Sequence, residues 1–285
     1  MSLSPSLLLA GCGDIGGRLA NQMLAAGWCV YGLRREIRRL PVGVLPVAGD
    51  LHSAACPPAW PSAELDYLVY CVAASEGGEG GYRAAYVDGL RHVLGWLAQA
   101  GQRPKRVLFV SSTSVYGQHD GEWIDETSAT EPEGFSGRIM LEAEQLLRSC
   151  GLPASVLRLS GIYGPGREFL LNQVRQGYRV INSPPLYGNR IHADDAAGLL
   201  AFLLQADARG VALEDCYIGV DDAPAPLHEV VAWLRDYLAV TTWAEESAVR
   251  RSGSKRCRNA RARALGWAPQ YPSYREGYAA LLAGA

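Results

Sequence analysis

Short apolar runs alternate with amphipathic stretches along the first three quarters of the chain. The first run, 6–10, is followed by a glycine-rich turn and by a helical pattern that ends before Gly27. A second run at 28–33 completes a strand, turn, helix and strand within about 30 residues. Further strands are predicted at 42–50, 65–74, 105–117 and 153–164, and helices at 82–101 and 142–151. Alternating strands and helices predict a parallel sheet covered on both faces.

The fold class that follows is α/β, with a Rossmann-type doubly wound sheet and a small C-terminal α/β substrate lobe. We expect 1–167, with about 190–220, to form the NAD(P)-binding domain, and 168–285 to form mainly the lobe. Ligands in such sheets bind at the carboxyl ends of the strands, so the candidate site residues are sought there.

The glycine-rich turn has the spacing of a dinucleotide-binding loop, Gly11-x-Gly13-x-x-Gly16. Gly11 would allow the tight turn, Gly13 would let the backbone approach a pyrophosphate, and Gly16 would let the helix pack on the strand. Asp14 and Ile15, at the helix N-terminus, are predicted to add cofactor contacts.

The same stretch also has the form of a bacterial lipoprotein box, Leu9-Ala10-Gly11-Cys12, which would place lipid on Cys12. No Lys or Arg precedes Cys12, and polar residues and a proline interrupt the apolar stretch that a signal peptide needs. We therefore expect a cofactor loop, in which a bound pyrophosphate would shield Cys12 from alkylation.

The end of the second strand indicates which cofactor binds. NAD sites usually carry Asp or Glu there, whereas this strand runs into Arg34 and Arg35, whose planar cations suit a 2′-phosphate. NADP is therefore expected rather than NAD, unless these arginines form only a solvated basic face. The remaining cofactor contacts are predicted at later strand ends: Asp50, Leu51, Val72, Ala73, Ala74 and Ser111.

Composition narrows the classes of partner. The net charge is −2, and the seven cysteines include no C-x-x-C pair. No apolar run reaches the ~18 residues of a membrane helix. We expect a cytoplasmic monomer or homodimer with free thiols and no metal site, acting on a small molecule and binding neither nucleic acid nor membrane.

Several motifs in order, "GCGDIGG", "FVSSTSVYG", "LRLSGIYGPGR" and "RIHADDAAGLLAFLL", resemble the extended short-chain dehydrogenases/reductases, the group of nucleotide-sugar epimerases and dehydratases. The C-terminal stretch resembles a narrower, atypical branch of NAD(P)-dependent epimerases. The resemblance implies hydride exchange with a nicotinamide, and a sugar or nucleotide sugar as substrate. It also implies a catalytic set of Ser or Thr, a Tyr-x-x-x-Lys pair and an Asn.

Only part of that catalytic set is present. Ser112 falls on the catalytic Ser, but Ser136 takes the Tyr position, Met140 the Lys position and Asp88 the Asn position. Losing a proton-transfer group typically costs ~10²–10⁴ in rate. Two interpretations stay open: an NADP-dependent epimerase/dehydratase-like oxidoreductase with rearranged catalytic groups, or a non-catalytic NADP-binding sensor or regulator.

The resemblance also suggests a substrate pocket. Ser114, Tyr116, Tyr163 and Arg190 are expected to contact substrate, and Tyr116, Tyr163 or Tyr86 would be available to replace the missing Tyr.

Three other polar residues are candidates for a binding or structural role. Lys255 and Arg256 are candidate anion contacts or part of a solvated basic turn, and His192 is expected to be structural.

Overall fold

The computed structural model describes residues 4–180, 183–244 and 253–284. The chain divides into two compact units. Unit 1 comprises Met1–Val115, Pro132–Arg158 and Ala197–Tyr217, and unit 2 comprises Tyr116–Glu131, Leu159–Ala196 and Ile218–Ala285. The sequence-based boundary at residue 167 falls inside unit 2, because the chain passes between the units several times.

A seven-stranded sheet of the Rossmann type organises unit 1. Its strands are β1 (Ser6–Ala10), β2 (Cys29–Arg34), β3 (Leu45–Ala48), β4 (Tyr67–Tyr70), β5 (Arg106–Ser112), β7 (Ala154–Leu159) and β11 (Cys216–Gly219). Their order is β11-β7-β5-β4-β1-β2-β3, so the winding direction reverses between β1 and β4. Ligands in open α/β sheets bind at this reversal, outside the carboxyl ends of the strands.

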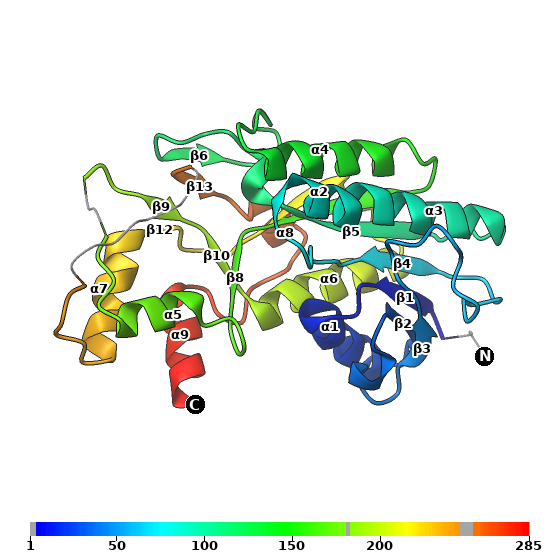
Figure 1. Ribbon diagram of the computed structural model, residues 1–285, viewed down its shortest axis with the longest axis horizontal. Helices are drawn as coiled ribbons and strands as arrows, with labels where there is room; N and C mark the ends of the chain where they lie inside the picture. The colour runs from blue at the N-terminus through cyan, green and yellow to red at the C-terminus, as the bar shows by residue number, and fades with distance from the viewer. Residues whose placement is uncertain (1–3, 181–182, 245–252, 285) are drawn as a thin grey trace. The chain divides into compact units, whose positions relative to one another are not determined.

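Helices cover both faces of this sheet (Figure 1). The longer ones are α1 (Asp14–Ala25), α2 (Gly78–Arg83), α3 (Gly89–Gln99), α4 (Phe135–Arg148) and α6 (Ala193–Ala208), and the short turns are η1 (Ile37–Arg39), η2 (Ala84–Asp88) and η3 (Thr113–Val115). In Figure 1, α3 and α4 lie on one face, and α1 and α6 on the other. The helix α1 ends as predicted, because Gly27 takes a φ of +80°.

The last apolar run of the sequence pattern does not form one strand. It breaks at Ser160 into β7 and β8 (Gly161–Tyr163), and β8 pairs in parallel with β10 (Arg190–His192). The break is stabilised by the Ser160 hydroxyl, which donates to the Asn189 carbonyl oxygen at 3.1 Å. Hydrophobicity marks both halves of the run but carries no sign of the change of sheet.

Unit 2 contains short strands and several helices. They are β6 (Glu122–Ile124), β9 (Tyr187–Gly188), β12 (Ala225–Pro226), β13 (Lys255–Cys257), α5 (Phe169–Arg175), α7 (Leu227–Tyr237), α8 (Ala260–Ala264) and α9 (Tyr274–Ala283). Its core is apolar and aromatic, with Tyr163, Leu171, Val230 and Tyr278 among its buried members.

Candidate cofactor and substrate site

The three glycines of the loop after β1 differ in how much space a side chain would have. Gly11 has a φ of +91°, and a Cβ there would collide with the Cys71 carbonyl group beyond β4. A Cβ on Gly16 would lie 2.6 Å from the Gly11 carbonyl oxygen, so α1 could not approach the loop. A Cβ on Gly13 would meet nothing within 4 Å, and this residue is exposed. The loop is therefore tightly packed at Gly11 and Gly16, whereas there is free space beside Gly13.

Cys12 belongs to this loop, between Gly11 and Gly13, and is fully buried, with an exposed fraction of 0%. Burial raises the pKa of its thiol to about 11. The expectation that a cofactor shields Cys12 from alkylation needs correction, because the protein itself already buries the side chain. A thiol so placed reacts slowly whether or not a ligand is bound.

Arg34 and Arg35, at the end of β2, differ in their surroundings. The Arg34 Nη1 donates to the Cys12 carbonyl oxygen at 3.0 Å and to the Arg39 carbonyl oxygen at 3.1 Å. It thus joins the glycine loop to the turn η1. Arg35 is exposed, as is Arg38 in the same turn. The nearby acid, Glu36, pairs with Arg39 at 2.8 Å.

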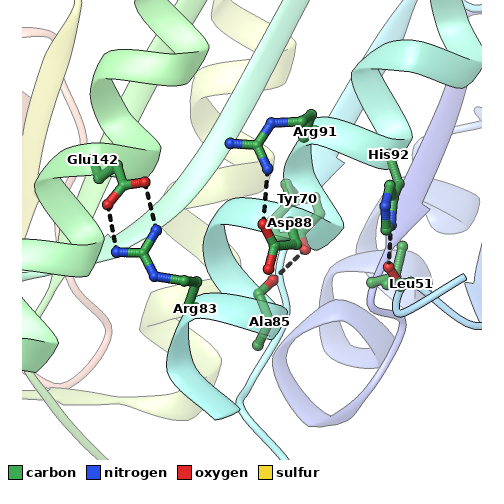
Figure 2. A network of polar contacts seen from close by, with 8 residues as sticks. All are labelled: Leu51, Tyr70, Arg83, Ala85, Asp88, Arg91, His92 and Glu142. Carbon is green, nitrogen blue, oxygen red and sulfur yellow. Dashed lines mark hydrogen bonds and ion pairs between the residues drawn. The ribbon is translucent and has the colours of Figure 1, made fainter. Parts of the chain in front are cut away.

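The other predicted cofactor residues lie at strand ends of unit 1. Leu51 is buried, and its carbonyl oxygen is 2.7 Å from the Nδ1 of His92 on α3 (Figure 2). Asp50 is exposed and accepts from the His52 amide at 3.1 Å. Past β4, Ala73 is exposed, with Val72 and Ala74 half-buried on either side.

Ser111 is built into an ion cluster in the interior. Its hydroxyl donates to Glu144 of α4 at 2.7 Å, and the Arg158 guanidinium binds the same carboxylate through two nitrogens, at 3.0 and 2.7 Å. Glu144 has no exposed surface, and Arg148 adds a further contact at 3.0 Å. The Ser111 side chain, predicted to contact cofactor, is thus engaged inside the protein.

The serines after β5 lie against the start of α4. The Ser112 hydroxyl accepts from the Ser114 amide at 3.1 Å. A Cβ on Gly137 would collide with the Ser114 carbonyl oxygen, so the first turn of α4 touches this segment directly. That turn carries Ser136, and Met140 follows it with an exposed fraction of 4%. The structure therefore brings Ser112 and Ser114 to the helix on which the resemblance expects Tyr and Lys.

Asp88 closes a π-helical turn, η2, between α2 and α3 (Figure 2). The Tyr70 hydroxyl enters this turn and donates to the Ala85 carbonyl oxygen, and it fills the space that a Cβ on Gly89 would need. The Asp88 carboxylate instead pairs with Arg91 at 2.7 Å, with 43% of its side chain exposed. The Asp88 carboxylate is thus used in an ion pair on the helix surface.

Three aromatic residues, one at the start of α4 and two on the α2–η2 segment, form a cluster that the sequence did not reveal. The ring of Tyr82 lies 5.3 Å from that of Tyr86 and 5.5 Å from that of Phe135, edge to face with the latter. Burial raises the pKa of Tyr86, and a hydrogen bond from the backbone of Ala74 opposes the rise. We call Tyr82, Tyr86 and Phe135 the aromatic cluster. Only the spacing of 82 and 86, one helical turn apart, hinted at it.

The candidate substrate residues of unit 2 are interior. Tyr116, Tyr163 and Arg190 are at most 3% exposed. Tyr163 packs on Tyr278 with ring centroids 4.4 Å apart, and burial raises its pKa. The Arg190 Nη1 donates to the Gly188 carbonyl oxygen at 3.1 Å. Within unit 2 these side chains are buried, and their contact with substrate stays a prediction.

The other polar residues of unit 2 also have structural partners. Lys255 donates to the Tyr116 carbonyl oxygen at 2.6 Å, and Arg256 donates to that of Gly121 at 2.7 Å. The His192 ring packs against Tyr271, with centroids 4.2 Å apart, in line with a structural role. The two predicted anion contacts thus have carbonyl partners in unit 2.

Within the parts of the chain that the structure describes, no three His, Cys, Asp or Glu side chains are grouped to hold a metal ion. Over the same residues, no helix is both long and apolar enough to cross a bilayer.

Comparisons with known proteins agree with this geometry. The sequence profile of the NAD dependent epimerase/dehydratase family matches residues 7–219. A solved structure from Methylobacillus flagellatus, provisionally assigned as an NAD-dependent epimerase/dehydratase, is 38% identical, with 99% of each chain covered and a TM-score of 0.81.

Two more distant proteins are also similar. The 3-diazoavenalumate denitrifying reductase of a Streptomyces species is 27% identical over 309 residues, covering 95% of this chain and 98% of the relative. The Thermotoga maritima UDP-glucose 4-epimerase, solved with UDP-glucose, has a TM-score of 0.80 over 98% of this chain and 97% of its own, at 15% identity. The likeness to the epimerase shows the fold alone. Since the family profile spans most of the chain and the Methylobacillus protein aligns along nearly all of it, the chain belongs to the NAD-dependent epimerase/dehydratase family.

Proposed function

We propose that the protein binds NADP at the reversal between β1 and β4 and works as a reductase on a small-molecule substrate. The observation that carries this proposal is the open space at Gly13, beside the N-terminus of α1. A helix N-terminus offers unpaired N–H groups to a phosphate, and the absent side chain lets a pyrophosphate approach them. The residues of the loop therefore fit a dinucleotide.

Preference for the 2′-phosphate rests on the arginines. Arg35 and Arg38 are exposed after the end of β2, and the acid between them, Glu36, is paired with Arg39. A guanidinium binds phosphate through two parallel hydrogen bonds, whereas NAD sites usually carry an Asp or Glu at the end of this strand, where this chain has Arg34 and Arg35. We assign phosphate recognition to Arg35 and the shaping of the loop to Arg34.

The reaction we propose is a reduction, for which the nicotinamide ring supplies the hydride. The Streptomyces relative is a reductase by name, and it aligns with nearly all of this chain. Among the hydroxyls of unit 1, Ser112 is the proposed substrate contact. Ser111 is committed to Glu144, and Asp88 to Arg91.

A second candidate, a non-catalytic NADP sensor or regulator, is favoured by one observation. Met140 occupies the lysine position as an apolar, buried side chain, 4% exposed. Consumption of NADPH with any carbonyl or imine substrate would exclude this alternative. A protein that binds NADPH and reduces none of a broad panel of substrates would support it.

The thiols support a reducing compartment, for which the cytoplasm is our proposal. No disulfide joins any of the seven cysteines, all of which lie in the described residues, and three of them are buried. The proposed cofactor contacts come from one chain, so a monomer or a homodimer would both serve.

Calorimetric titration of the full chain with NADPH and with NADH tests the proposal. We expect NADPH to bind at least about tenfold more tightly, which corresponds to ~1.4 kcal/mol. Equal affinities, or tighter binding of NADH, would refute the 2′-phosphate assignment, and lack of binding to either would refute the cofactor site.

A further inference from the structure

We propose that this site acts on a planar, cationic electrophile of the iminium class, which accepts hydride without a proton from the protein. The inference rests on the proposed reductase function and names its substrate class. Three observations support it: Ser136 and Met140 stand where the family has its Tyr and Lys, an aromatic cluster lies nearby, and the charges around that cluster favour a cation.

Proton supply is the first point. Reduction of a neutral carbonyl needs an acid at the oxygen, and a phenol held beside a lysine is suited to give it. At the corresponding positions α4 carries Ser136, an aliphatic alcohol and so a far weaker acid, and buried Met140. A substrate that is already cationic removes the need for such an acid.

The aromatic cluster provides the second point. Tyr86 is bonded to the Ala74 backbone past the end of β4, and Phe135 directly precedes Ser136 at the start of α4. Tyr82 touches both rings, at 5.3 and 5.5 Å. Three ring faces and edges thus lie between one strand end and the helix turn that contacts Ser114. Aromatic faces attract cations within about 6 Å by ~0.5–2 kcal/mol, with no need for a counter-charge.

Local charge is the third point. Two arginines of the helix that carries Tyr82 and Tyr86 are paired with acids: Arg83 binds both carboxylate oxygens of Glu142, at 2.6 and 2.8 Å, and Arg91 pairs with Asp88 (Figure 2). Arg138, one turn after Phe135, donates to the Glu133 carbonyl oxygen. Two exposed carboxylates lie close in sequence to Tyr82: Glu76 precedes α2, and Glu79 is in its first turn. The field around the cluster therefore favours a positive ligand over a phosphate.

The step balances without an acid. One hydride passes from the reduced nicotinamide dinucleotide to the electrophilic carbon and forms a C–H bond. The C=N⁺ π electrons become the lone pair of a neutral amine nitrogen, and the dinucleotide leaves oxidised. Because no proton enters, the rate should show little dependence on pH.

Binding without turnover gives the first test. The protein is saturated with NADP⁺ and titrated with N-methylquinolinium and with neutral 4-methylquinoline. We expect the cation to bind at least about tenfold more tightly. Tyr82→Leu should weaken cation binding at least about fivefold, whereas Tyr82→Phe, which keeps the ring, should stay within about twofold. Tyr237→Leu, at an exposed position on α7, is the matched control.

Turnover gives the second test. With NADPH, N-methyl-3,4-dihydroisoquinolinium should be reduced at least about 100-fold faster than 1-tetralone, with kcat/KM changing less than about threefold between pH 6.5 and 9. Equal affinity for the two quinolines, comparable ketone reduction, preferred binding of UDP-glucose, or loss of turnover in Tyr82→Phe would each overturn the inference while leaving NADPH binding intact. Absence of NADPH binding would overturn the proposed function and this inference together.

Discussion

In the loop after β1, the missing Cβ of Gly16 lets α1 approach the carbonyl oxygen of Gly11; in the first turn of α4, that of Gly137 lets the helix approach the carbonyl oxygen of Ser114. Both regions therefore use a glycine to bring a helix onto the end of a strand. They differ in what they offer a ligand. The loop has free space beside Gly13, whereas the start of α4 carries the hydroxyl of Ser136 and the buried thioether of Met140.

The comparison separates packing from chemistry. The helix α4 is held against β5 and β7 by its buried Glu144, which accepts from Ser111 and from the buried Arg158, while Arg148 adds a contact from the surface of the same helix. The chemistry at Ser136 and Met140 can therefore differ from that of related enzymes without loss of the fold. In the loop, the backbone atoms that bring α1 onto β1 also belong to the proposed cofactor contact, so a change there should affect both the fold and the proposed binding.

The largest expected effect concerns the support of α4. Glu144→Ala removes the carboxylate that binds the buried Arg158 through two nitrogens, and should lower the free energy of unfolding by about 3–5 kcal/mol. Glu142→Ala is the matched control, since its pair with Arg83 is about 44% exposed and should matter much less. Denaturant unfolding measures both. Similar losses in the two variants would show that the interior cluster does not hold the helix.

The next effect concerns the loop. Gly13→Val fills the open space and should weaken NADPH binding at least about 100-fold, or ~2.7 kcal/mol, because the side chain would occupy the place of the pyrophosphate. The thermal midpoint should move by less than about 2 °C, since no protein atom is displaced. Gly95→Val, another glycine with free space around it, is the control for binding. Unimpaired binding in Gly13→Val would remove the loop from the site.

The third prediction separates the roles of Arg34, the last residue of β2, and Arg35, which follows it. Arg35→Ala should weaken NADPH about tenfold, or ~1.4 kcal/mol, and leave NADH unchanged, because only the 2′-phosphate is lost as a partner. Arg34→Ala should weaken both dinucleotides by a similar factor, since it releases the Cys12 carbonyl and with it the loop. Calorimetry on both variants decides. An Arg34→Ala protein that loses NADPH alone would reverse the assignment.

The smallest effects lie at the turn of α4. Ser136→Ala and Met140→Leu should each keep turnover within about threefold, under ~0.7 kcal/mol, because neither carries a proton-transfer group. Ser112→Ala should lower turnover about tenfold, as expected for a lost hydrogen bond to substrate. Steady-state kinetics on the N–H iminium 3,4-dihydroisoquinolinium, which unlike its N-methyl derivative can donate a hydrogen bond to the Ser112 hydroxyl, provides the measurement. A large loss in Ser136→Ala would mean that this serine takes the tyrosine's part.

The sequence predicted the sheet and the loop because both follow from local patterns. Apolar runs of strand length and glycines at fixed spacing are fixed by short-range geometry, and β1, α1 and the stop at Gly27 follow them. Pairing is different. The strand β11 was missed, and β8 was joined to β7, because the partner of a strand is decided by residues far away in the chain.

Side-chain direction was the other limit. Arg34 and Arg35 are identical and adjacent in sequence, yet one bonds two carbonyl oxygens and the other is exposed. Ser111 was expected to contact cofactor, but its partner is Glu144, 33 positions later. Such partners arise from tertiary contacts, which periodicity does not encode.

The π-turn η2 changes the direction in which the side chains of α3 point relative to those of α2. An α-helix rotates about 100° per residue, so the extra residue of a π-turn displaces every later side chain by about that angle relative to the earlier ones. Arg83 precedes the offset and reaches Glu142, while His92 follows it and reaches Leu51. Gain or loss of one residue within Ala84–Asp88 would keep a continuous helix and yet rephase its two halves, so that only one of these contacts survived. An insertion or deletion within Ala84–Asp88 should therefore disturb these contacts more than a substitution there would.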